Sequence, residues 1–167
     1  MSHSLSFVAA AIFGLLVVMA MSIFTVDQRK FAIVLQLGEI KEVIAEPGLN
    51  FKWPLIQNVR YFEKRILTYD APEPERFITS EKKPVLVDAF VKWRIIDAKQ
   101  YYISVQGDEA RAHIRLSQTV NAGLREEFGR RTVHEVVSGE REKIMDEVRI
   151  KADADARAIG VQIVDVR

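Results

Sequence analysis

The residues of this chain that are chemically suited to catalysis are few and scattered. Its 167 residues include three histidines, His3, His113 and His134, and no cysteine. Hydrolysis by a hydroxyl nucleophile would need a histidine beside the nucleophile and a third group to orient that histidine. No nucleophile motif flanks His113 or His134, and both fall in segments expected to be helical. The sequence therefore predicts surface or packing histidines, no catalytic residue and a non-enzymatic protein.

Metal, cofactor and nucleic-acid sites have no better support. His134 and Glu135 are adjacent, but no further ligands stand at metal-binding spacing. The eight glycines are scattered and form no phosphate-binding loop. Because 24 basic residues are balanced by 23 acidic ones, the net charge of +1 gives no electrostatic reason for nucleic-acid binding. We expect no metal, no cofactor and no nucleic-acid partner.

Charge is absent from the first 26 residues and dense in the remainder of the chain. All Lys, Arg, Asp and Glu residues lie between Asp27 and Arg167. A helix over residues 5–26 would be roughly 33 Å long, enough to cross a hydrocarbon core of about 30 Å. The sequence therefore predicts a short tail over 1–4 and a membrane-spanning helix over 5–26. Its lipid-facing residues would be Leu5, Phe7, Ile12, Phe13, Leu15, Leu16, Ile23 and Phe24.

Two other interpretations fit this segment less well. A cleaved signal peptide would need a basic start and a shorter apolar core, although Val18 to Ala20 resembles a weak cleavage site. A buried core helix would normally be shorter. Arg29 and Lys30 follow the span, so a positive-inside count places the rest of the chain in the cytoplasm. Long domains often cross the membrane regardless of such charges.

The first part of the charged region has the pattern of β-structure. Phe31, Ile33, Leu35 and Leu37 alternate toward one face, Gly38 and Glu39 form a turn, and residues 40–44 return as a second strand. Residues 59–69 are expected to form a further strand. The proline-rich stretch 71–75 then predicts a boundary between a first subdomain, 27–75, and a second, 76–167.

The second subdomain begins with the clearest alternation in the chain. Between Val85 and Ile96 the odd positions are all apolar, whereas the even ones include Asp88, Lys92 and Arg94. This pattern predicts a strand with one packed face, in an antiparallel sheet covered by helices on one side.

Three helices are expected after this strand. Asp108 can cap the first, whose stripe would be Leu116, Val120, Leu124 and Phe128, ending at Gly129. Thr132 and Glu135 have the spacing of a capping box. Ser138 opens the third, which carries Ile144, Val148, Ala152, Ala156 and Ile159 and ends near Gly160. With a last strand over 161–167, strands first and helices after them indicate an α+β fold.

Four segments in a fixed order carry a resemblance to a known family. After the N-terminal span come EPGLNFKWPLI, RFITSEKKPVLVDAFVKWRI, LREEFGRRTVHEVVSGEREKIMDEVR and GVQIVDVR. With these, residues 20–167 resemble the band-7 or SPFH superfamily of stomatins, prohibitins and flotillins, and most closely its HflC branch. Family members continue past the last strand into a long coiled-coil helix, which this chain is expected to lack.

The resemblance implies a scaffold. HflC-like proteins assemble with an HflK-like subunit into large hetero-oligomers that enclose the FtsH-like membrane protease and restrict its access to substrates. It also implies a single-pass protein of the bacterial inner membrane with a periplasmic SPFH domain, opposite to the charge count. A stomatin- or prohibitin-like organiser of membrane microdomains, with no protease partner, would share every feature of this sequence.

Three surfaces stay open between alternatives. The loop with Phe51, Trp53, Leu55 and Ile56 either packs in the core, as apolar residues beside strands usually do, or rests on the lipid surface. The charged helix over 140–157 is more often a solvated face than a subunit contact. A charged stretch before and within the second subdomain is also expected to be solvated. The alternative is that its charges pair with opposite charges on a neighbouring subunit and so set the register between subunits: Glu73, Glu75, Arg76, Glu81, Lys82 and Lys83.

Overall fold

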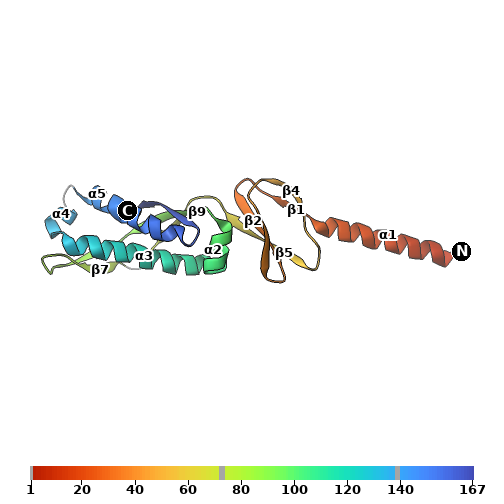
Figure 1. Ribbon diagram of the computed structural model, residues 1–167, viewed down its shortest axis with the longest axis horizontal. Helices are drawn as coiled ribbons and strands as arrows, with labels where there is room; N and C mark the ends of the chain where they lie inside the picture. The colour runs from red at the N-terminus through yellow and green to blue at the C-terminus, as the bar shows by residue number, and fades with distance from the viewer. Residues whose placement is uncertain (1, 72–73, 138–139) are drawn as a thin grey trace. The chain divides into compact units, whose positions relative to one another are not determined.

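The computed structural model describes residues 2–71, 74–137 and 140–167, and within helix α1 it describes side chains from Ile12 onward. The chain divides into two compact units, the first ending at Glu63 and the second running from Lys64 to Arg167. Figure 1 shows their elements in order, from the red N-terminal helix to the blue C-terminal end. Antiparallel strands build both units, and helices follow the strands in the second, so the described fold is α+β as predicted.

The boundary between the units differs from the predicted one at residues 75/76. Strand β6 (Leu67–Asp70) pairs with β9 (Phe90–Ile95), which places it in the second unit. The strand expected over 59–69 is in fact two strands, because β5 (Gln57–Glu63) ends at the boundary. Within the proline-rich stretch, Pro72 and Glu73 lie outside the described residues.

Helix α1 (Ser2–Ser22) is shorter at its C-terminal end than the helix predicted over 5–26. Residues Ile23–Val26 form strand β1 instead and pair with β4 (Gly48–Phe51). Aromatic and β-branched residues favour a strand here, and alternation turns Phe24 and Val26 inward to a small core. Among the residues the structure describes, no helix combines the length and apolarity needed to cross a membrane.

The first unit also contains a three-stranded sheet in the order β3-β2-β5, with β2 (Lys30–Gln36) between β3 (Glu39–Ile44) and β5. Four consecutive residues of β2, Ala32 to Leu35, are buried, so both faces of this strand are covered. Ala32 and Val34 pack with the inward residues of β1. The expectation that Leu37 continues the packed face is wrong, because Leu37 lies in a turn and is 87% exposed.

The second unit contains a sheet of order β10-β9-β6 and a separate ribbon of β7 (Glu75–Ile78) and β8 (Pro84–Val87). The strand predicted over 85–96 is interrupted at Asp88 and Ala89, so that its two halves belong to different sheets. Its predicted faces are confirmed: Val91, Trp93 and Ile95 are buried, whereas Lys92 and Arg94 lie on the other face.

Helices α2 (Ala98–Val105) and α3 (Glu109–Arg130) begin at aspartates. The sequence did not predict α2, whose cap is Asp97. Asp108 caps α3 as expected, accepting a hydrogen bond of 2.9 Å from the Ala110 N–H. The predicted stripe on α3 is confirmed, since its members are all buried: Leu116, Val120, Leu124 and Phe128.

The remaining helices are α4 (Val133–Val137) and α5 (Arg141–Arg157), and the last strand is β10 (Val161–Val166). The predicted capping box starts α4: the Thr132 N–H donates to Glu135 Oε2 at 2.7 Å, and the Glu135 N–H donates to Thr132 Oγ1 at 3.3 Å. Ser138, the predicted start of the next helix, lies outside the described residues. Four of the residues predicted to face the core are buried on α5: Ile144, Val148, Ala152 and Ala156. The fifth, Ile159, is also buried but lies after the last residue of this helix.

Candidate functional site

His113 and His134 occupy packing and surface positions, as the sequence predicts, and the side chain of His3 lies outside the described residues. His134 is exposed on α4. His113 lies on α3 with its ring centroid 4.8 Å from that of Tyr69 and 5.7 Å from that of Trp93. Its Nε2 lies 3.5 Å from Glu109 Oε1. Aromatic rings and one carboxylate surround His113, an arrangement that fits packing between the sheet and α3.

The aromatic cluster around His113 is part of the core of the second unit. Trp93 is fully buried, and its ring lies 6.2 Å from that of Tyr101 on α2. Burial, followed by the charges of Glu109 and Asp108, raises the pKa of Tyr101 to about 12, so its phenol stays neutral near pH 7. Among the described residues, no group of three or more acidic or histidine side chains is placed to hold a metal ion.

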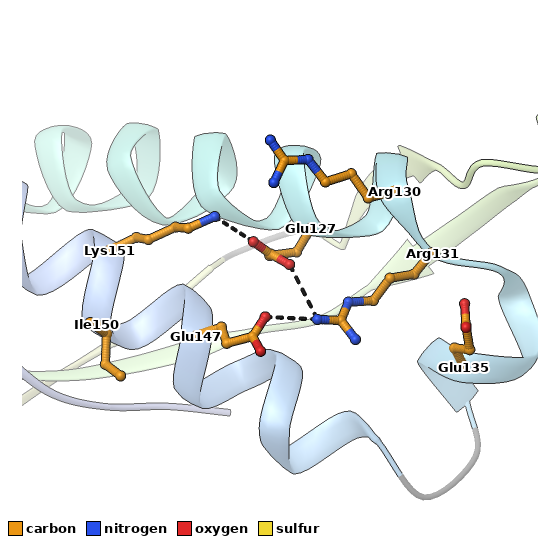
Figure 2. Close-up of a pocket in the computed structure, with 7 residues that line it drawn as sticks. All are labelled: Glu127, Arg130, Arg131, Glu135, Glu147, Ile150 and Lys151. Carbon is orange, nitrogen blue, oxygen red and sulfur yellow. Dashed lines mark hydrogen bonds and ion pairs between the residues drawn. The ribbon is translucent and has the colours of Figure 1, made fainter.

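A charged pocket lies between α3 and α5, which pack against each other (Figure 2). At its centre, Lys151 Nζ donates a hydrogen bond to Glu127 Oε1, and Arg131 Nη2 lies 3.5 Å from Glu127 Oε2. The same Arg131 nitrogen lies 2.7 Å from Glu147 Oε2. Figure 2 shows these side chains bridging the two helices. The pocket is lined by Glu127, Arg130, Arg131, Glu135, Glu147, Ile150 and Lys151.

The electrostatics of this pocket indicate a structural role. Glu127 is only 4% exposed, and the hydrogen bond from Lys151 lowers its pKa despite burial, with Arg131 adding to the effect. Three carboxylates and three cationic side chains line the pocket, so their formal charges cancel. A bound ion would have to displace these existing pairs. We therefore assign the pocket to holding α3 against α5.

Most large apolar side chains of the loop around Trp53 are exposed to solvent. The exposed fractions are 75% for Phe51, 72% for Trp53, 98% for Leu55 and 47% for Ile56. These exposed fractions show that the alternative in which the loop packs in the core is wrong. Such a group of apolar side chains on a small domain is typical of a contact with another apolar phase.

Hydrogen bonds hold this loop at the end of the three-stranded sheet. The Trp53 N–H donates to Gln57 Oε1 at 2.8 Å, and the Gln57 N–H donates to the Trp53 carbonyl at 3.0 Å. Gln57 is the first residue of β5 and pairs with Gln36, the last residue of β2. The exposed side chains therefore project from a loop with defined geometry.

The β1–β4 ribbon extends this exposed apolar surface. Register places Ile23 opposite Phe51 and Thr25 opposite Leu49, on one face, while Phe24 points to the other face. Ile23 is 47% and Leu49 70% exposed. We call the combined surface the apolar rim: Ile23, Leu49, Phe51, Trp53, Leu55 and Ile56.

The apolar rim is tied directly to the end of α1. The Lys52 N–H donates to the carbonyl of Ser22 at 2.8 Å, joining the loop to the last residue of the helix. On α1 the predicted lipid-facing residues with described side chains are exposed: Ile12, Phe13, Leu15 and Leu16. The side chains of Leu5 and Phe7 lie outside the described residues.

Two members of the predicted lipid-facing set lie in strand β1 and differ from each other. Ile23 belongs to the apolar rim, but Phe24 is only 8% exposed, packs with Val26, and cannot contact lipid from that position. The physical reason is the change from helix to strand at Ile23, which makes neighbouring residues face opposite sides.

The charged stretch near β7 and β8 has partners within its own unit. Glu75 accepts a hydrogen bond from Asn121, and Glu81 pairs with Lys83 at 3.1 Å. These contacts fit solvated or structural charges better than groups reserved for a neighbouring subunit. Glu73, predicted to belong to the same set, lies outside the described residues.

The sequence of this chain is similar to several bacterial proteins named HflC. "Protein HflC" of Haemophilus influenzae is 38% identical over 171 residues, covering 96% of this chain and 58% of the relative. "Modulator of FtsH protease HflC" of Escherichia coli K12 is 38% identical over 149 residues, covering 85% of this chain and 44% of the relative. "Protein HflC" of Buchnera aphidicola from Acyrthosiphon pisum is 33% identical, covering 100% of this chain and 59% of the relative.

The chain thus spans about half the length of these relatives. The family described as SPFH domain / Band 7 matches residues 24–167, from the first strand of the first unit to the end of the second. The chain belongs to the SPFH domain / Band 7 family.

Proposed function

We propose that this chain is a non-enzymatic, membrane-anchored SPFH subunit that regulates an FtsH-like membrane protease. In this proposal it assembles with an HflK-like subunit into a large hetero-oligomer that encloses the protease and restricts its access to substrates. The observation that carries the proposal is the 38% identity, over 85% of this chain, to a relative named as a modulator of FtsH protease. The balanced charges of the α3–α5 pocket agree with a scaffold role.

A membrane anchor at the N-terminus is the second part of the proposal. Residues 1–26 contain no Lys, Arg, Asp or Glu, which supports insertion of α1 in a bilayer. The protein would be a single-pass protein of the bacterial inner membrane, with the two units forming two subdomains of a periplasmic SPFH domain. The exposed apolar residues on α1, such as Phe13 at 70%, are consistent with lipid around them.

Lipid contact by the apolar rim is the third part. Trp53 has a large apolar ring with a polar N–H, a combination favoured at the interface between lipid and water. Because Lys52 is hydrogen-bonded to the last residue of α1, an anchored helix would bring the rim to the bilayer surface. The rim would then hold the first unit against the membrane.

Purification of the full chain from bacterial membranes tests the protease partnership most directly. We expect an HflK-like subunit and an FtsH-like protease to co-elute with the tagged chain after mild solubilisation. Recovery of a large assembly that contains neither protein would favour the alternative, an organiser of membrane microdomains.

A double variant, His134→Ala with His113→Phe, is the matched control for an enzymatic role. Both substitutions remove an imidazole, and His113→Phe keeps a ring in the aromatic cluster. If the chain has no enzymatic role, the HflK-like subunit and the FtsH-like protease should co-elute with this double variant as they do with the original chain.

A further inference from the structure

The turn that joins β2 to β3 contains a leucine where leucine is unfavourable. Gln36 pairs with Glu39, so Leu37 and Gly38 alone form the turn, with φ of 52° and 93°. Positive φ at both central residues is typical of a type I′ hairpin, which prefers Asn-Gly. Glycine accepts this backbone freely, whereas leucine is strained in it.

The strain at Leu37 is not offset by burial of its side chain. Leu37 is 87% exposed, so burial in its own chain does not compensate for the strain. Leu55 in the apolar rim repeats the combination, with φ of 74° and 98% exposure. In the described chain these are the two most exposed large apolar side chains, and both stand in left-handed backbone.

Register places the two leucines at the same end of the three-stranded sheet. Gln36 and Gln57 are paired across β2 and β5, Leu37 directly follows the first, and Ile56 directly precedes the second. Gln57 Nε2 also donates to Gln36 Oε1 at 3.3 Å. The hairpin tip therefore lies beside the loop that carries Trp53 and Leu55.

We propose that the β2–β3 hairpin tip is a second lipid contact, with Leu37 as the inserted side chain. The first unit then meets the bilayer at two neighbouring points, the Leu55 loop and the Leu37 turn, with this end of its sheet toward the lipid. The inference rests on the proposed lipid contact of the apolar rim and adds a site outside it. Lipid is the partner that this surface fits best. Lys52, in the neighbouring loop, is hydrogen-bonded to the end of the uncharged helix α1, which we propose is inserted in the bilayer.

The charged residues beside the hairpin tip and the Trp53 loop predict which lipid headgroups the contact requires. Glu39 adjoins the hairpin tip and Lys52 adjoins the loop, so opposite charges flank the contact. Insertion should accordingly depend on apolar side chains and should occur in a zwitterionic bilayer without anionic lipid. Quenching that appears only after anionic lipid is added would overturn this apolar contact.

Single-cysteine labelling of the full chain tests the proposal, because the chain has no native cysteine. Leu37→Cys, Leu55→Cys and the control Glu42→Cys, an exposed site on the same hairpin, are each labelled with an environment-sensitive fluorophore in phosphatidylcholine bilayer discs. Nitroxide-bearing lipids should quench the probes at 37 and 55 at least about three-fold more than the probe at 42. Quenching at 55 with none at 37 would overturn the second contact and leave the rim contact standing. Absence of quenching at both would overturn the lipid contacts together.

Leu37→Asn separates a lipid role from a structural one. Asparagine before glycine is the favoured sequence of a type I′ turn, so the variant should melt at the same or a higher temperature than the original chain. A lower melting temperature would show that Leu37 supports the fold, contrary to the proposal.

Discussion

The two tryptophans of this chain, one in each unit, have opposite environments. Trp93 is fully buried beneath α2 and α3, whereas Trp53 is 72% exposed on a loop held by hydrogen bonds. Both lie in sequences rich in apolar residues, Trp93 within strand β9 and Trp53 just after strand β4. The apolar residues of the second unit therefore build a core, whereas those at one end of the first unit form an exposed surface, which we propose contacts the bilayer.

An aspartate introduced into each region should produce the largest difference. Val91→Asp would bury an unpaired charge at a position that is 2% exposed, and should lower the free energy of unfolding by about 4 kcal/mol or more. Leu49→Asp, at 70% exposure, should change it by about 0.5 kcal/mol or less. Chemical denaturation measures both. Equal losses would contradict the division into core and rim.

Truncation of the two tryptophans should give the next largest difference. Trp93→Ala leaves a cavity in a packed core and should destabilise the second unit by roughly 3 to 5 kcal/mol. Trp53→Ala removes an exposed ring and should destabilise by less than about 1 kcal/mol. Thermal melting monitored by circular dichroism would follow both variants. A loss of several kcal/mol from Trp53→Ala would place that ring in a core after all.

The buried Glu127 carboxylate should make stability depend on acidic pH. Its pKa is lowered in the folded state from an ordinary value of 4.5, chiefly by the Lys151 hydrogen bond. Its contribution is therefore fully present above about pH 4.5 and is lost as the pH falls through the lowered folded value. Glu127→Gln should destabilise by about 2 kcal/mol at pH 7 and flatten the acid limb of a plot of unfolding free energy against pH. An unchanged acid limb would refute the assignment.

Lys92→Ala should have the smallest effect. Lys92 lies on the face of β9 opposite Trp93, with its Nζ 6.0 Å from the centroid of the Phe90 ring. Loss of this weak contact should change the free energy of unfolding by about 0.5 kcal/mol. Greater damage from Lys92→Ala than from Val91→Asp would mean that the faces of this strand are inverted.

Local chemistry explains which parts of the fold the sequence predicted. The α3 stripe, its Asp108 cap and the Thr132–Glu135 capping box each depend on residues within a single helix or its first turn. The packed face of β9 depends on simple alternation. Each of these signals is complete within a short segment, so tertiary structure has little opportunity to override it.

The features that the sequence failed to predict depend on distant partners. Strand β1 lies at the end of an uncharged run that predicts a helix. Its partner β4 lies more than twenty residues away, so no local signal indicates the strand. Glu127 and Lys151 are separated by 24 residues, and their meeting requires α3 and α5 to pack. The exposure of Trp53 and Leu37 depends on where the sheet ends. The pairing that creates that edge is not visible from composition.

Quenching of tryptophan fluorescence by brominated lipid tests the central claim, that the apolar rim contacts the bilayer. The chain has two tryptophans, so Trp93→Phe leaves only Trp53, and Trp53→Phe leaves only Trp93. Full-length chains in bilayer discs would be compared with and without brominated acyl chains. We expect strong quenching of Trp53 and little quenching of Trp93. Equal quenching of the two, or none at Trp53, would contradict it.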